Sequence, residues 1–170
     1  EQLIQQRDPA AEKSAKEMGV NPKAIISQAA LETGWGKYMI TDTSSDTQDK
    51  NSFNFFGIKA DHRWGGDKVT VTTHEYRDGQ RITEKADFRA YASIEAGLKD
   101  YSEFLKAERY QKALAAGTDV KEYAHQLQQA GYATDPRYAE KITRIATSEL
   151  MQTTFTASAL AQHNSEVPRG

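Results

Sequence analysis

The sequence predicts an α+β domain that is mostly α-helical and carries one inserted β-hairpin lobe. Three prolines follow Asp or Asn, and apolar residues recur at helical spacing after each pair. The Asx side chain caps free N–H groups at a helix start, and proline suits the first turn. The hairpin is indicated by 68–76, which alternates and is rich in β-branched residues, followed by the turn pair Asp78-Gly79.

The N-terminal part of the chain predicts two helices and two non-helical segments. Helices are expected over 9–18 and 22–33, because each begins at an Asx-Pro pair and is followed by a glycine. The segment 41–52 holds no apolar residue and predicts an exposed loop, whereas the aromatic run 53–58 is typical of a core.

Strands and then further helices are expected in the remainder of the chain. The two strands of the hairpin cover 68–76 and about 81–91. Ser93 is expected to cap the next helix, and Asp119 resembles the start of a capping box that opens a helix ending at Gly131. The pair Asp135-Pro136 predicts the start of the last helix.

Length and charge limit the function classes. The chain has 170 residues, with 22 basic and 24 acidic side chains, so its formal charge is −2. This suits one domain, expected over 1–150, with a flexible tail over 151–170 where the pattern fades. Near-neutral charge argues against a nucleic-acid partner, which requires a basic face. No apolar run approaches the ~20 residues of a membrane span. The chain begins with Glu, so we expect a piece of a longer or processed protein.

The sequence lacks the residues that several kinds of functional site require. Cysteine is absent, which excludes disulfides, thiolate metal sites and a cysteine nucleophile. No phosphate-binding glycine motif is present, and the four histidines do not have the spacing of a helical zinc site. Asp42 begins a calcium-like pattern, but Thr47 replaces its glycine and Phe53 its final glutamate. We therefore expect neither a metal nor a cofactor.

Glu32 is the candidate acid. It follows Ile25 by seven positions and Ala29 by three, so helical geometry turns it toward the apolar stripe. It also lies in the last turn, where the helix dipole disfavours a negative charge. Burial and the dipole should both raise its pKa, which is what a general acid needs near neutral pH. The alternative is an ordinary glutamate turned outward at a frayed helix end.

Other polar and aromatic residues are candidates for binding sugar. Sugar rings stack on flat aromatic side chains, and for this Trp35, Tyr91 and Tyr132 are candidates. Core packing is the alternative for each of them. Asn54 either binds substrate or caps a turn.

Five separated motifs resemble those of family 73 glycoside hydrolases, the bacterial β-N-acetylglucosaminidases that cut peptidoglycan. The run QAALETGWG at 28–36 is similar to the signature around the family's catalytic glutamate. The others follow in the family's order: NFFGIK at 54–59, FRAY at 88–91, DY at 100–101 and GYATDPRYA at 131–139. The resemblance covers about 8–150, with Phe55 where the family usually has leucine.

The resemblance implies a lysozyme-like fold with Glu32 as the acid and a second carboxylate on the hairpin. We assign the second to Glu75, because it shares its strand face with Val69 and Val71, whereas Glu84 and Asp87 suit the solvated face. The loop tyrosine Tyr132 matches a family tyrosine that faces the cleft. The hairpin has few anchors in the sequence, so we expect both carboxyl groups to face one groove but to stand more than ~9.5 Å apart. Hairpin closure or the substrate's own acetamido group would then complete the mechanism.

The activity that the resemblance implies is endo-hydrolysis of β-1,4 bonds in peptidoglycan after N-acetylglucosamine. In the subgroup that resembles this chain most, hydrolysis opens the wall locally for flagellar rod assembly. The implied location is the periplasm, and the implied partners are glycan strands and, through a missing N-terminal region, flagellar rod proteins. We expect a monomer. Muramidase or lytic transglycosylase specificity remains open, as does a non-catalytic glycan-binding or scaffold module.

Overall fold

The computed structural model describes residues 9–34, 40 and 51–152. The first two helices, α2 (Pro9–Met18) and α3 (Pro22–Thr33), have the bounds that the sequence predicts. Asn21 accepts a hydrogen bond from the Lys23 backbone N–H at 2.9 Å, so the Asx cap is formed. Gly34 ends α3 with φ 56° and ψ 48°, a left-handed backbone that glycine adopts without strain.

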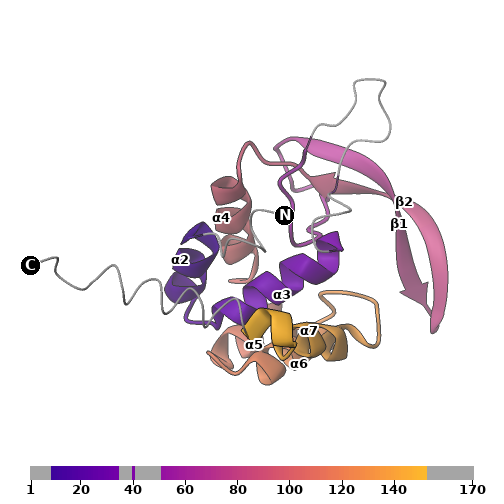
Figure 1. Ribbon diagram of the computed structural model, residues 1–170. Coiled ribbons are helices and arrows are strands. Elements are labelled where there is room, and N and C mark those ends of the chain that lie inside the picture. The colour runs from indigo at the N-terminus through magenta and orange to yellow at the C-terminus, as the bar shows by residue number, and fades with distance from the viewer. Residues whose placement is uncertain (1–8, 35–39, 41–50, 153–170) are drawn as a thin grey trace, which may run out of the picture.

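The predicted hairpin is confirmed. Strands β1 (Lys68–Arg77) and β2 (Gln80–Arg89) pair antiparallel, in a register that sets Val69 against Phe88. The turn residues Asp78 and Gly79 have φ values of 52° and 77°, as a two-residue type I′ turn requires. In Figure 1 the hairpin projects to one side of the helices.

The remaining helices depart from prediction in two places. They are α4 (Ile94–Phe104), the 3-10 helix η1 (Glu108–Tyr110), α5 (Gln111–Ala115), α6 (Val120–Gln129) and α7 (Tyr138–Ala146). Ser93 and Asp119 cap α4 and α6 as expected. The last helix, however, begins at Tyr138, because Asp135 first accepts from the Arg137 N–H and forms a turn around Pro136. The helices η1 and α5, which have no side-chain cap, are not predicted from the sequence.

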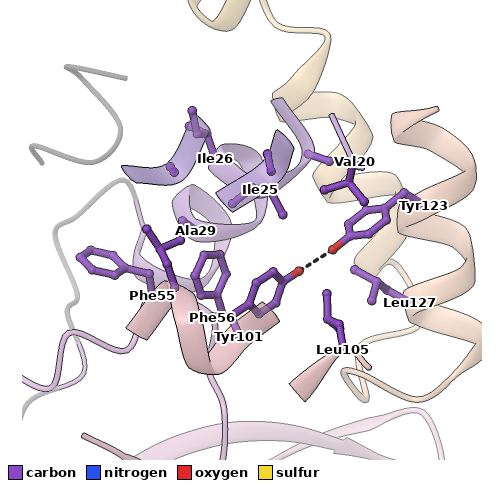
Figure 2. Packing of buried hydrophobic residues seen from close by; sticks show 14 of the residues in the cluster. Val20, Ile25, Ile26, Ala29, Phe55, Phe56, Tyr101, Leu105, Tyr123 and Leu127 are labelled. Carbon is purple, nitrogen blue, oxygen red and sulfur yellow. Dashed lines mark hydrogen bonds between the residues drawn. The ribbon is translucent and has the colours of Figure 1, made fainter. Parts of the chain in front are cut away.

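Helix α3 is the centre of the core. Its residues from Ala24 to Ala30 are all buried, as expected of a helix surrounded by others. Figure 2 shows the packing around it. The rings of Phe56 and Tyr101 are stacked there, with their centroids 4.0 Å apart. Because α3 is fixed on all sides, the carboxyl group at its C-terminal end is held by a rigid element. Within the described ranges, no helix is long and apolar enough to cross a membrane.

Candidate active site

A groove of about 470 Å³ runs between the C-terminal end of α3, the hairpin and the loop between α6 and α7. Both predicted carboxylates, Glu32 and Glu75, line it. Around these two carboxylates, the lining includes Gly57, Lys59, Tyr132, Thr134 and Tyr138. The expectation that the two carboxyl groups share one groove is therefore confirmed.

Glu32 is partly buried in the last turn of α3. Tyr138 of α7 donates a hydrogen bond to its Oε1 at 3.0 Å. Burial raises the pKa of Glu32 to about 7; the Tyr138 bond opposes this rise, and the negative charge of Glu75 adds to it. The side chain can thus hold a proton near neutral pH, which matches the sequence-based expectation for Glu32.

Gly57 makes room for this carboxyl group. Its φ is 64°, and a Cβ at this position would lie 2.7 Å from Glu32 Oε2. Any other residue would therefore both strain the backbone and displace the carboxyl group. In the sequence Gly57 stands out only as part of a motif, because its contact with Glu32 joins distant parts of the chain.

Glu75 lies opposite, on β1, and is fixed by two bonds. Lys59 Nζ forms an ion pair with Oε1 at 2.5 Å, and Thr134 Oγ1 donates to Oε2 at 2.7 Å. Burial acts to raise the pKa of Glu75, but the bonds from Lys59 and Thr134 outweigh it and leave the pKa below its usual value. The two carboxyl groups therefore have opposite preferences, one for the proton and one for the charge.

Thr134 also anchors the hairpin. Its hydroxyl oxygen accepts from the Tyr76 N–H at 3.0 Å while its proton goes to Glu75. This joins β1 to the loop between α6 and α7 across the groove. The expectation of a hairpin with few anchors was wrong at this point, because the anchor comes from a residue 58 positions away, which a local pattern cannot reveal.

The predicted aromatic contacts divide into three cases. Tyr132 lines the groove, but its hydroxyl donates to the Phe56 carbonyl at 2.5 Å and its ring stacks on Tyr138, so it also belongs to the core. Tyr91 is absent from the described lining of this groove, since its hydroxyl donates to Asp100. Trp35 lies outside the described residues.

Asn54 serves the fold rather than the groove, which corrects the substrate-binding alternative. It is 1% exposed. Its Nδ2 donates to the carbonyls of Ile58 and Arg89, and its Oδ1 accepts from the N–H groups of Phe56 and Ile58. All four bonding positions of the amide are occupied by backbone. The side chain thus fixes the turn that carries Gly57.

Replacing Asn54 with Ala should therefore lower stability. Two buried N–H groups and the Arg89 carbonyl would lose their bonds to the amide, while the Ile58 carbonyl keeps a bond from the Arg89 N–H. Unsatisfied buried groups cost ~1–3 kcal/mol each. We expect the free energy of unfolding to fall by about 3 kcal/mol, with turnover per folded molecule changed less than tenfold. Urea denaturation and an activity assay corrected for the folded fraction measure both. A stable variant that has lost turnover would restore the substrate-binding role of Asn54.

The charges along the groove are mixed. Cationic Lys59, Arg89 and Arg109 line it together with anionic Asp61 and Asp135, besides the two glutamates. Across the described parts of the chain, no three His, Asp or Glu side chains gather where they could hold a metal ion. The chemistry that the groove can perform with its own residues is proton transfer and charge stabilisation.

A protonated carboxyl group and an ionised one across a groove are the pair of groups that most glycoside hydrolases use. The family model for Glucosaminidase, described as mannosyl-glycoprotein endo-β-N-acetylglucosaminidase, matches residues 8–150. The chain belongs to this family.

Within this family, the chain is similar to several individual proteins. The chain is 45% identical over 138 residues to the peptidoglycan hydrolase FlgJ of Vibrio cholerae, a match that covers 81% of this chain and 40% of that protein. This chain thus spans about two fifths of that relative's length. The likeness to a solved peptidoglycan hydrolase mutant from Sphingomonas sp. A1 has a TM-score of 0.79 and 39% identity, covering 88% of this chain and 94% of that one.

A truncated glycoside hydrolase domain of FlgJ from Salmonella typhimurium is also similar in structure. Its TM-score is 0.62 at 38% identity, and the match covers 84% of this chain and 90% of that one. These neighbours confirm the expected fold, a lysozyme-like helical domain with an inserted hairpin.

Proposed function

We propose that this chain hydrolyses β-1,4 bonds of peptidoglycan after N-acetylglucosamine, with Glu32 as the general acid. The observation that supports this most is the environment of Glu32, in which burial beside the Glu75 charge raises the pKa to about 7. Protonation of the leaving oxygen requires a carboxyl group that keeps its proton near neutral pH. The family and the names of the relatives support the choice of glycan.

We assign Glu75 the role of the second carboxylate. Its low pKa keeps it ionised, so it can stabilise the positive charge that develops on the sugar ring. A separation from Glu32 of more than ~9.5 Å stays a prediction, under which hairpin closure or the substrate's acetamido group supplies the remaining step. The anchor through Thr134 favours the second of these, because it restrains movement of β1 relative to the loop between α6 and α7.

A Glu75→Gln variant tests this role. Gln keeps the size but loses the charge, so we expect turnover to fall by about 10²-fold. Glu84→Gln is the matched control, since Glu84 lies on the same hairpin in an ion pair with Arg77 at 2.8 Å and does not line the described groove. Near-normal turnover of Glu75→Gln would leave Glu32 as the only essential carboxylate.

Product analysis tests the activity itself. Purified peptidoglycan is digested with the protein, and the released reducing ends are identified by mass spectrometry. Reducing N-acetylglucosamine ends are the expected result. N-acetylmuramic acid ends would instead indicate a muramidase, anhydro ends a lytic transglycosylase, and no release a glycan-binding or scaffold module.

The family and the names of the relatives also support a proposal for where the protein acts in the cell. A peptidoglycan hydrolase acts outside the cytoplasm, and we propose the periplasm. Local opening of the wall for a flagellar rod, and contact with rod proteins through further sequence, extend this proposal. Localisation of the full-length protein with and without an intact flagellar rod would test both.

A further inference from the structure

A fully buried amide lies one turn before the candidate acid. Gln28 precedes Glu32 by four positions on α3 and is 0% exposed, among neighbours that are mostly apolar. Burying an amide is costly unless both of its ends are hydrogen-bonded. Here Nε2 donates to the Tyr138 hydroxyl at 2.9 Å, and Oε1 accepts from the Tyr101 hydroxyl. Through Tyr138, the amide therefore links the candidate acid to the hydrogen-bonded pair Tyr101 and Tyr123.

Because each hydroxyl group has a single proton, the donor in every bond of this hydrogen-bonded series can be assigned. A phenol has one proton to donate. The Tyr101 proton goes to Gln28, so in the 2.6 Å bond between Tyr101 and Tyr123, drawn in Figure 2, Tyr123 is the donor. At the other end, Gln28 donates to the Tyr138 oxygen, so the Tyr138 proton is directed to Glu32 Oε1. Every donor in the chain points toward the carboxyl group.

Hydroxyl groups alone would not fix this direction. A row of phenols can reverse all its protons together, because each oxygen both donates and accepts. An amide cannot, since its donor and its acceptor are different atoms. Gln28 is the only member of this hydrogen-bonded series with this property, and it stands between the Tyr101–Tyr123 pair and Tyr138.

We propose that Gln28 is a positioning residue that holds the Tyr138 proton toward Glu32 Oε1 and so keeps the acid proton on Oε2, beside Gly57. This rests on the proposed function, in which Glu32 is the acid. Because Oε1 is occupied by the Tyr138 donor, the proton that Glu32 delivers leaves from Oε2. After delivery, the same donor stabilises the ionised carboxylate.

The variant Gln28→Met tests this. Met has similar length but no amide, so Tyr138 loses its donor and can turn its proton away from Glu32. Ionised Glu32 then loses stabilisation, and its carboxyl group should titrate about 0.5–1 pH unit higher than in the wild type. The pH at which activity falls on the alkaline side should rise by the same amount. We expect kcat to fall about tenfold with little change in KM.

The titration is read by NMR of protein labelled with ¹³C at glutamate carboxyl groups, with the Glu32 signal identified by its loss in Glu32→Gln. Three titratable groups act on Glu32: Tyr138 of α7, Glu75 of β1 and Tyr132 of the loop between α6 and α7. Gln28→Met leaves all three in place. A Glu32 titration equal to that of the wild type in folded Gln28→Met would overturn the proposal.

Two further variants complete the experiment. Ser27→Ala is the matched control, because Ser27 is a buried polar neighbour whose hydroxyl has no hydrogen-bond partner in the described part of the chain. It should leave the titration unchanged, and an equal shift there would also overturn the proposal. If Gln28→Met does not fold, Tyr101→Phe removes only the hydroxyl that orients the amide, and the same upward shift is expected.

The titration tests the positioning role of Gln28 separately from the role of Glu32 as the acid. The titration does not depend on turnover. An active Glu32→Gln variant would refute Glu32 as the acid, yet the Gln28 effect on the Glu32 titration would still be measured. Conversely, an inactive Glu32→Gln variant with no Gln28 effect would refute only the positioning role.

Discussion

Replacing Glu32 with Gln is expected to lower the hydrolysis of purified peptidoglycan by about 10²–10⁴-fold, the usual cost of losing a general acid. Gln keeps the volume and can still accept the Tyr138 bond, but it has no proton to deliver. The release of reducing ends per folded molecule measures the loss. A variant that keeps most of its activity would move the acid to another residue.

The same substitution should stabilise the protein at alkaline pH. The folded state raises the pKa of Glu32 from its usual 4.5 to about 7, so it binds this proton more tightly than the unfolded chain does. Wild-type stability therefore falls as pH rises from about 4.5 through about 7, by about 3 kcal/mol at most. Gln has no such loss, so the variant should equal the wild type near pH 4 and exceed it near pH 8. Equal stability at both values would contradict the raised pKa.

The second large effect is expected at Gly57. An Ala Cβ there would stand 2.7 Å from Glu32 Oε2 and must push the carboxyl group away. Because a misplacement of ~1 Å can cost ~10²-fold in rate, we expect Gly57→Ala to lower kcat by about 10²-fold. Steady-state kinetics on peptidoglycan fragments measures this.

The control for Gly57→Ala is Gly19→Ala. Gly19 also has a positive φ, 75°, but a Cβ there would meet nothing within 4 Å. Both substitutions should cost ~1–2 kcal/mol of stability through the left-handed backbone. Only Gly57→Ala should lose turnover per folded molecule, and an equal loss in both would show that backbone strain alone explains it.

Local signals were sufficient for much of the fold. Helices α2 and α3 were predicted with the right bounds, because an Asx-Pro start and a following glycine mark both ends. The hairpin was recognised from alternation and the turn pair. In contrast, η1 and α5 begin without a side-chain cap, and the only such boundary signal beside them is Gly117, two positions after α5.

The candidate site was predictable only in part. Glu32 was found because its place on the apolar stripe is a local property. Its contact with Tyr138 joins residues 106 positions apart, and neither Gln28 nor Gly57 shows in the sequence what it will meet. For the same reason the sequence offers Asn54 and Tyr91 as candidates for substrate contact, although the fold directs their polar groups into hydrogen bonds with the protein itself.

The role of Glu32 as the acid is tested most directly by titrating its carboxyl group in the wild-type protein, followed by ¹³C NMR. We expect a midpoint near pH 7, because burial and the Glu75 charge outweigh the Tyr138 bond. A midpoint near 4.5, the ordinary value of a glutamate, would mean that Glu32 is ionised at neutral pH and would contradict its role as the acid.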